Sequence, residues 1–357
     1  MLQSNTSSPL QLLFLAGDGI GPEITAATKN VLSAVTPVCD RAITVTEADI
    51  GFRALEASGC TIPDSVRAAA KEADGVVLGP VSHNAYPPAE QGGLNPSGTL
   101  RKDLDLYANV RPARIWEGVP RLSTQAFQLT VMRENLEGFY ADRNMYQGPG
   151  EFMPEPDTAL AFRKITRRAS TRIAEAAFKH AEQNGFSRVT AVHKANVMRI
   201  SDGLFLECCR AVANNYPAIT YDELLVDAAA AHLVRNPAAF GVIVTTNMFG
   251  DILSDLASEL SGGLGVAGSL NLGPRFAVAQ AQHGSAPDIA DKGIANPISL
   301  ILSLAMLLRH LGEARASEVI ETAIAKTLPH TRTRDLGGTA TTIEFTTALI
   351  RAIEVGS

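Results

Sequence analysis

Four short apolar runs constrain the fold of this chain more than any other feature of its sequence. Each run carries few polar residues, so the strand that it forms must be covered on both faces. Helical patterns lie between the runs, and the clearest repeats apolar residues from Ala169 to Ala181 and ends at Gly185. Strands that alternate with helices predict an α/β fold with a substantially parallel sheet. The runs are residues 11–16, 76–78, 189–192 and 241–245.

Length and composition exclude several classes of protein. The chain has 357 residues, 46% of them hydrophobic, which is enough for about two domains. A net charge of −6 argues against nucleic-acid binding, and no apolar run approaches the ~20 residues that cross a bilayer. The first ten residues do not have the pattern of a secretory signal. The spacing of the four cysteines fits neither a zinc ribbon nor a disulfide framework, so we expect a cytoplasmic protein.

Residues 17–23, GDGIGPE, predict a tight turn between the first strand and a helix. Pro22 suits the first turn of that helix, and Glu23 suits its positive end. The glycine spacing differs from the G-x-G-x-x-G of a dinucleotide-binding turn, and no strand with a terminal acid follows about 20 residues later. We therefore do not interpret the turn as a Rossmann site, although its backbone amides can approach a ligand.

Two acids follow the last apolar run and suggest a metal site. Asp251 and Asp255 are four positions apart, so they project from one face of a helix near its start. Acids also favour helix N-termini for structural reasons. The functional interpretation is a site for Mg²⁺ or Mn²⁺, which take oxygen ligands. Asp227 is a lone acid in an apolar stretch, where an unpaired carboxylate is costly, and is the natural third ligand.

Three arginines and two proton-transfer candidates complete the chemistry. Arg101, Arg111 and Arg133 are each more often surface residues when taken singly, but three near an acidic metal site suggest a polycarboxylate substrate. Lys194 ends a predicted strand, where burial or a nearby cation lowers a lysine pKa toward a useful range. Tyr140 could supply a proton. On spacing alone, a structural role is equally compatible with both residues.

Two loop segments remain. Residues 283–289, HGSAPDI, form a small, amide-rich loop that a cofactor could occupy. Residues 146–156 are rich in Pro and Gly but also contain Phe, Met and Tyr, which is unusual for a disordered linker. We interpret this second segment as a loop or a β-hairpin arm for subunit contact, with a plain surface loop as the alternative.

Together these segments resemble the β-decarboxylating dehydrogenases, the isocitrate and isopropylmalate dehydrogenase family. The matching stretches occur in family order and cover essentially the whole chain, so the combination is specific although no single motif is. They are GDGIGPEI at 17–24, TLRKDLDLYANVRP at 99–112, RENLEGFY at 133–140, HKANVMRISDGLF at 193–205, NMFGDILSD at 247–255, HGSAPDIADKGIANP at 283–297 and DLGGTATTIEF at 335–345.

The resemblance implies a two-domain fold with a mostly parallel sheet in the terminal domain and a cofactor site unlike the Rossmann type. Residues 1–105 and 262–357 would form a cofactor-binding domain that joins both chain ends. Residues 106–261 would form a central dimerisation domain with an arm near 141–165. The protein would be a homodimer whose two active sites lie between the subunits.

The resemblance also implies a role for each candidate. The three arginines would hold the malate part of the substrate, and Asp251 and Asp255 would bind Mg²⁺ or Mn²⁺ with Asp227 of the partner subunit. Lys194 of the partner subunit would take the hydroxyl proton, and Tyr140 would donate the proton that completes decarboxylation.

NAD is the cofactor that the resemblance implies. An acid at position 288 can accept hydrogen bonds from a ribose 2′-hydroxyl and would repel a 2′-phosphate, so we predict NAD rather than NADP. The contacts would come from His283, Gly284, Ser285, Ala286, Asp288, Ile289 and Asn296.

The segment before Arg101 departs from the isopropylmalate enzymes, which typically place an acid and paired leucines there. Residues 95–99, NPSGT, are small and polar, and burying Asn95 and Ser97 unpaired against an alkyl group would cost free energy. We therefore favour a polar or small 3-substituent, as in isocitrate or homoisocitrate. Gln280 stands where the family commonly has a glutamate, which is compatible with an unusual 3-substituted malate.

Several alternatives stay open at this point. The leading hypothesis is NAD- and metal-dependent oxidative decarboxylation of an isocitrate- or homoisocitrate-like substrate. 3-Isopropylmalate, D-malate and tartrate are alternatives within the same chemistry. A non-catalytic regulatory subunit of an isocitrate dehydrogenase is a distant alternative, since such a subunit is expected to lose the tyrosine, the lysine or the metal acids, and all five are present.

Overall fold

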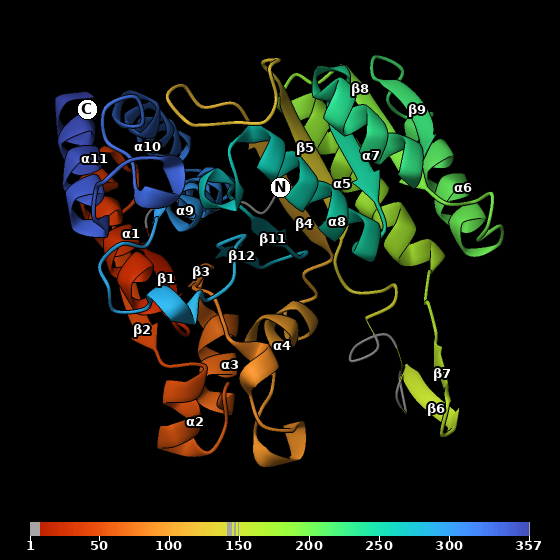
Figure 1. The fold of residues 1–357 in the computed structure, drawn as a ribbon, viewed down its shortest axis with the longest axis horizontal. Helices are drawn as coiled ribbons and strands as arrows, with labels where there is room; N and C mark the ends of the chain where they lie inside the picture. The colour runs from red at the N-terminus through yellow and green to blue at the C-terminus, as the bar shows by residue number, and fades with distance from the viewer. Residues whose placement is uncertain (1–7, 141–144, 146–147, 149, 357) are drawn as a thin grey trace.

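The computed structural model describes residues 8–140, 145, 148 and 150–356, and its centre is a ten-stranded sheet (Figure 1). The strands of this sheet are β1 (Leu10–Leu15), β2 (Ile43–Ala48), β3 (Gly75–Leu78), β4 (Ala108–Arg114), β5 (Gln128–Glu134), β8 (Arg188–His193), β9 (Thr220–Leu225), β10 (Val242–Thr245), β11 (Leu270–Leu272) and β12 (Ala277–Gln280). The helices are α1 (Gly21–Val35), α2 (Phe52–Ser58), α3 (Asp64–Glu72), α4 (Pro96–Asp103), α5 (Arg167–Gln183), α6 (Ser201–Ala213), α7 (Val226–Arg235), α8 (Asn247–Ser261), α9 (Ile298–His310), α10 (Ala314–Thr327) and α11 (Thr342–Gly356).

The sheet confirms the predicted mostly parallel α/β fold. Its strand order is β2-β1-β3-β12-β11-β4-β5-β10-β8-β9, and antiparallel pairing is confined to the β12–β11, β11–β4 and β4–β5 contacts. The strands from β2 to β11 come from the two ends of the chain, and the strands from β4 to β9 come from its middle. The domain boundaries at 105/106 and 261/262 stay a prediction.

The helices begin and end where local chemistry favours it. Pro22 lies in the first turn of α1, as expected, because its missing N–H would have no partner there. The Thr166 hydroxyl caps α5 by accepting a hydrogen bond from the Ala169 backbone N–H at 3.2 Å, and Gly185 follows the helix with a positive φ of 71°. Within the described residues, no helix is long and apolar enough to cross a membrane.

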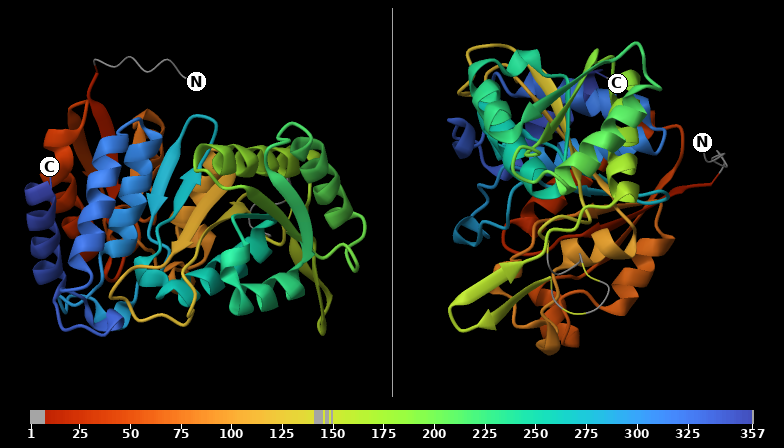
Figure 2. Two further views of the ribbon diagram at one scale, coloured as in Figure 1. Left: turned by 90° about the horizontal axis from the view of Figure 1, so that it is seen from above. Right: turned by 90° about the vertical axis from the view of Figure 1, so that its right-hand side faces the viewer.

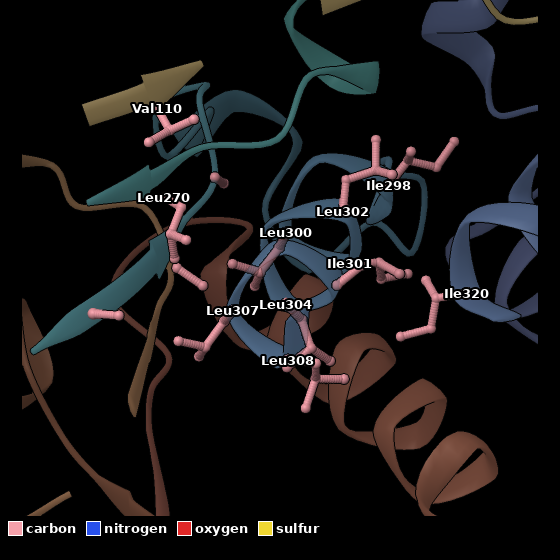
Figure 3. Packing of buried hydrophobic residues seen from close by; sticks show 14 of the residues in the cluster. Val110, Leu270, Ile298, Leu300, Ile301, Leu302, Leu304, Leu307, Leu308 and Ile320 are labelled. Atoms are coloured by element: carbon pink, nitrogen blue, oxygen red, sulfur yellow. The ribbon is translucent and has the colours of Figure 1, made fainter. Parts of the chain in front are cut away.

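The hydrophobic core differs between the two faces of the sheet. On one face a single cluster continues across the whole sheet, under α1, α9, α10 and α11 at one end and under α5 and α6 at the other. Figure 3 shows part of it, where Leu300, Leu304 and Leu307 of α9 pack near Leu270 of β11. On the opposite face the core is divided into two separate clusters, one under α3 and α4 and the other under α7 and α8.

A two-stranded hairpin projects from the body of the molecule (Figures 1 and 2). It consists of β6 (Glu151–Glu155) and β7 (Thr158–Ala161), which pair antiparallel and are exposed along their length. The hairpin alternative for this segment is therefore confirmed for the described residues. Residues 141–144, 146, 147 and 149 of the expected arm lie outside them, and contact with another subunit stays a prediction.

Candidate functional site

A row of polar side chains crosses the centre of the sheet on the face where the core is divided. Successive side chains of a strand point to opposite faces, so Arg111 shares a face with Asn109 of β4, and Arg133 shares a face with Val131 of β5. Asn109 is paired with Arg133 and Arg111 with Val131, which places the two arginines diagonally on one face. Both arginines are buried, at 8% and 2% exposure, so the surface interpretation of these two was wrong.

Helix α8 brings the two predicted metal ligands against these arginines. Arg111 Nη1 lies 3.1 Å from Asp251 Oδ1 and 3.1 Å from Asp255 Oδ1. Arg133 also donates to Asp251 Oδ1, which fixes this carboxylate between two guanidinium groups. Burial raises the pKa of Asp251, but the charges of Arg133 and Arg111 outweigh burial and hold the pKa below its usual range.

Tyr140 joins the same cluster. Its hydroxyl donates to Asp251 Oδ2 at 3.0 Å and accepts from Arg133 Nη2 at 2.7 Å. Burial raises the pKa of Tyr140, while the charge of Arg133 lowers it and that of Asp251 raises it, and the net pKa is above the usual range. The hydroxyl therefore stays protonated at neutral pH and is held in place by a charged group on each side.

The segment 95–101 approaches the cluster from helix α4. Asn95 is the N-cap of α4, and its Oδ1 accepts from the Gly98 backbone N–H at 3.1 Å. This acceptor thus serves the helix, a role that the sequence analysis did not consider for Asn95. Ser97 is buried and donates to Gln280 Oε1 at 3.0 Å. The positive charge of Arg101, one helical turn further on, acts on both Asp251 and Tyr140.

Lys194 and Asp227 form a second group away from this cluster. Lys194 Nζ lies 2.6 Å from Asp227 Oδ1, and their side chains are 26% and 65% exposed. The expectation that Asp227 is a costly buried acid was therefore wrong for the single chain, because α7 presents it to solvent. No group of three acidic, histidine or cysteine side chains among the described residues could hold a metal ion, so Asp227 does not join Asp251 and Asp255 within one chain.

The pair Asp251 and Asp255 nevertheless fits a hard divalent cation in its chemistry. An oxygen of each carboxylate lies 3.1 Å from Arg111 Nη1, and both side chains remain partly exposed. The lowered pKa of Asp251 keeps its carboxylate ionised. Asp255 Oδ2 has no hydrogen-bond partner among the described residues. Two carboxylates that contact the same guanidinium nitrogen can supply part of a coordination shell and leave the remaining ligands to substrate, water or another chain.

The loop predicted to hold the cofactor is fastened to the glycine turn. The Ile20 backbone N–H donates to the Ser285 carbonyl at 2.9 Å, and the Ser82 and Ser285 hydroxyls lie 2.7 Å apart. A Cβ on Gly19 would stand 2.0 Å from the Ser285 oxygen, so glycine is required for this approach. Ala286 has a positive φ of 38°, which leads the loop into the short turn Pro287–Ile289.

The side chains of this loop differ in their exposure and in whether their polar atoms already have hydrogen-bond partners. Gly284 and Asp288 are exposed, and Ile289 is half-buried. His283 Nε2 is buried without a hydrogen-bond partner among the described residues, and burial lowers the pKa of His283. Asn296 is buried and already occupied, because Nδ2 donates to Asp335 at 2.9 Å and Oδ1 accepts from the Ile298 N–H at 2.9 Å. Asn296 therefore anchors the loop.

Sequence reasoning missed two amide side chains that position the charged groups. Asn247 Oδ1 accepts from Arg133 Nε at 2.9 Å, and its Nδ2 donates to the Glu137 carbonyl. Gln282 Nε2 lies 3.1 Å from Asp255 Oδ1 and 2.9 Å from Ser258 Oγ, so it links the cofactor loop to a metal candidate. Only their positions in the sequence could have indicated these roles. Asn247 is the first residue of α8, and Gln282 directly precedes the 283–289 loop.

Fold and site together define an α/β protein with an arginine- and carboxylate-lined site for a small polar ligand. The chain belongs to the isocitrate/isopropylmalate dehydrogenase family, whose model matches residues 11–352. Members of this family are β-decarboxylating dehydrogenases that act on small hydroxy acids.

Individual relatives agree with this assignment. A 3-isopropylmalate dehydrogenase of Archaeoglobus fulgidus is 42% identical over 94% of this chain and 97% of its own length. A mitochondrial NAD isocitrate dehydrogenase catalytic subunit of Arabidopsis thaliana is 40% identical over 97% of this chain and 89% of its own length. The crystal structure of isocitrate dehydrogenase from Methylococcus capsulatus superposes with a TM-score of 0.87 at 37% identity, covering 97% of this chain and 99% of that one.

Proposed function

We propose that this protein catalyses the NAD- and divalent-metal-dependent oxidative decarboxylation of a 3-substituted malate, with an isocitrate- or homoisocitrate-like substrate favoured. The observation that carries the proposal is the cluster of Arg111, Arg133, Tyr140 and Asp251. It combines guanidinium groups for carboxylates, a protonated hydroxyl and an ionised oxygen ligand within hydrogen-bond distance of one another. Membership of a β-decarboxylating dehydrogenase family supports the reaction class.

The arginines would bind and orient the substrate. Arg111 and Arg133 are fixed by Asn109 and Asn247, so they lose little freedom when a carboxylate binds. Arg101, on α4, would contribute a third positive charge, since its charge acts on Asp251 and Tyr140. A substrate with two or three carboxylates would thus be held between the strands of the sheet and α4.

Two proton transfers would be made by residues of the protein. Lys194 of the partner subunit would accept the C2 hydroxyl proton as hydride leaves C2 for the nicotinamide, which oxidises the alcohol to a ketone. The bond between C3 and its carboxylate then breaks, CO₂ leaves, and the electron pair at C3 takes a proton from Tyr140. A bound Mg²⁺ or Mn²⁺, held by Asp251 and Asp255 with Asp227 of the partner subunit, supplies Lewis-acid stabilisation of the developing negative charge.

The exposed carboxylate of Asp288 supports NAD as the cofactor. It can accept hydrogen bonds from ribose hydroxyls and would repel a phosphate on the 2′ position. The buried, unpartnered Nε2 of His283 provides a further polar contact for a ligand in this loop. The 40% identical Arabidopsis relative is named as an NAD enzyme, which is consistent with this assignment.

The polar contact between Ser97 and Gln280 supports a polar 3-substituent. Ser97 lies on α4 one turn before Arg101. Ser97 and Gln280 both carry hydrogen-bonding groups, whereas a hydrophobic pocket for a branched alkyl group would need apolar side chains there. Isopropylmalate stays the second candidate, because the 42% identical Archaeoglobus relative is named for that substrate. We further propose that the protein is a cytoplasmic homodimer whose active sites are shared between the two subunits.

The test is NADH formation by the purified protein with NAD and Mn²⁺. Isocitrate, homoisocitrate, 3-isopropylmalate, D-malate and tartrate are offered side by side at equal concentration. A clear preference for a tricarboxylate is expected. Preference for isopropylmalate would contradict the interpretation of Ser97 and Gln280 but keep the reaction class, and no turnover with any hydroxy acid would contradict the function itself.

A further inference from the structure

A cavity lies between helix α4 and the start of helix α5. It has a volume of about 240 Å³ and is lined by residues from α4 and the turn after it, from the segment after β5, and from the start of α5. The lining residues are Lys102, Asp105, Leu136, Glu137, Lys164, Thr166, Arg168, Ala169 and Arg172. No candidate for catalysis, metal or NAD binding is among them.

The charges around this cavity do not balance. Four cationic side chains line it, against the two carboxylates of Asp105 and Glu137. Both oxygens of Glu137 are occupied locally, since the Thr166 backbone N–H donates to one at 2.9 Å and the Thr166 hydroxyl to the other at 2.7 Å. Glu137 therefore fixes the start of α5 and has little capacity left for the cations.

The remaining carboxylate cannot satisfy the cations either. Asp105 Oδ2 accepts from Arg172 Nη1 at 2.6 Å and lies 3.6 Å from Arg168 Nη2. Arg172 Nε is buried and has no hydrogen-bond partner among the described residues. The Nζ atoms of Lys102 and Lys164 form no hydrogen bond or ion pair with any residue that the structure describes. The two lysine ammonium groups are thus available to a ligand, whereas the Arg172 guanidinium is held by Asp105 and lies over the Tyr107 ring at 4.5 Å.

We propose that this cavity binds a dianionic phosphate group, either free phosphate or the phosphate of a small monoester. The surplus of two positive charges matches the two negative charges of such a group. Cations approach from α4 on one side and from Lys164 and α5 on the other, and a tetrahedral oxyanion can accept hydrogen bonds from several directions at once. The volume suits a phosphate group better than a whole nucleotide, because ligand pockets of drug size begin at about 300 Å³.

The site would connect two parts of the chain that are distant in sequence. Lys102 belongs to α4, next to Arg101 of the candidate active site, whereas Arg168 and Arg172 belong to α5. A bound dianion would reinforce the contact that Asp105 and Arg172 already make between these two parts. This inference does not depend on the proposed function, because the cavity and the catalytic candidates share no residue.

The experiment measures binding directly by isothermal titration calorimetry at low ionic strength, with the candidate active site saturated by the best substrate analogue and Mg²⁺. Inorganic phosphate and a nucleoside monophosphate are titrated in separate arms, which distinguishes free phosphate from a monoester. The variant is Lys102→Ala with Lys164→Ala, since both side chains are exposed and unpaired, so the fold should be retained. Lys179→Ala is the matched control, because Lys179 is an exposed lysine of the same helix α5 but does not line the cavity.

We expect the wild type to bind at least one of the two probes, the double variant to bind it roughly tenfold more weakly or worse, and the control to bind as the wild type does. Circular dichroism checks that all three proteins are folded. The proposal is overturned if the wild type binds neither probe, if the double variant binds equally well, or if Lys179→Ala loses affinity to the same extent.

Discussion

The arginine, tyrosine and aspartate cluster consists of side chains that hold one another in fixed geometry before any ligand arrives. Arg133 is 2% exposed and contacts Asn247, Asp251 and Tyr140. A buried guanidinium group is stable there because Asn247 accepts two of its hydrogen bonds and Asp251 and Tyr140 accept one each. At the residue scale, each of these groups therefore has both a positioning and a chemical task, and substitutions can separate the two.

Replacing the two proton-transfer candidates should give different defects. Tyr140→Phe removes the proton donor but keeps the ring, so decarboxylation should slow by at least about 100-fold while hydride transfer is less affected. Lys194→Met should slow both steps, because the hydroxyl proton has no acceptor. NADH and CO₂ release in single-turnover experiments measure the two steps. Equal and negligible losses in both variants would contradict the assigned roles.

His180 should make the stability of the protein depend on pH. Burial lowers the pKa of His180 from 6.5 to about 4, and its Nε2 lies 3.1 Å from the Thr130 hydroxyl. Between pH 6.5 and pH 4, His180 is protonated in the unfolded chain but still neutral in the folded chain. The free energy of unfolding therefore has its full value above pH 6.5 and falls as the pH drops toward 4. The loss amounts to at most about 3 kcal/mol.

The variant His180→Gln should have a flatter profile of unfolding free energy against pH between 6.5 and 4. Urea unfolding at several pH values provides the measurement, and His330→Gln, a substitution at a histidine elsewhere in the chain, provides the control. A profile of the His180 variant that is parallel to that of the wild type would contradict the prediction.

At the scale of elements, the glycine turn acts as a support for the loop at 283–289. Gly19 has a φ of 58°, and a Cβ there would meet the Ser285 carbonyl at 2.0 Å. Gly59 has a similar φ of 74°, but a Cβ there would meet nothing within 4 Å. An alanine at position 59 would thus cost only the free energy of the left-handed backbone conformation, whereas an alanine at position 19 would also have to displace the loop.

Gly19→Ala should destabilise the protein more than Gly59→Ala, which should cost only about 1–2 kcal/mol for its left-handed backbone. Gly19→Ala should also raise the Kd for NAD several-fold, because the loop is pushed away from the turn. Thermal unfolding and fluorescence titration with NADH measure both effects. Similar values for the two variants would show that the turn does not support the loop.

The elements also show how much was predictable from sequence. The strands and helices around 11–35, 189–213 and 241–261 followed from apolar runs and helical spacing. The common face of Arg111 and Arg133 depends on the pairing of β4 with β5, which the sequence does not show. The use of Asn95 as a helix cap depends on where α4 begins, which a loop-like NPSG segment does not reveal. The long-range pairing of β11 with β4, and the contact of Ser97 with Gln280, come from segments more than 150 residues apart and could not be read locally.

At the scale of the whole molecule, the catalytic candidates form two groups that one chain does not bring together. Tyr140, Arg133 and the α8 acids make one group, and Lys194 with Asp227 makes the other. The exposure of Asp227 in the single chain has a simple explanation if a second subunit covers it. Local spacing in the sequence could not show such a cover, and within the single chain Asp227 contacts Lys194 instead of the other acids.

Mixing two inactive variants tests whether the site is shared. If Lys194 acts on the site of the other subunit, a dimer of one Lys194→Met chain and one Asp251→Asn chain has one intact site and one site with both changes. Random mixing should then restore roughly a quarter of wild-type activity, because half of the dimers are mixed and half of their sites are intact. Activity after co-refolding of the two variants is the measurement, and no recovery above the separate variants would contradict sharing.

The core that continues along one face of the sheet has a further consequence, which concerns how the chain loses its structure. Residues from both ends of the sequence and from its middle pack into that one cluster, so neither half can melt and leave the other with its buried surface intact. Despite a length typical of two domains, the chain should unfold in one cooperative transition, with calorimetric and van't Hoff enthalpies that agree when calculated for the unit that unfolds. Two separate heat-absorption peaks would contradict this. The continuous face therefore makes the molecule a single thermodynamic unit, although the opposite face carries two separate clusters.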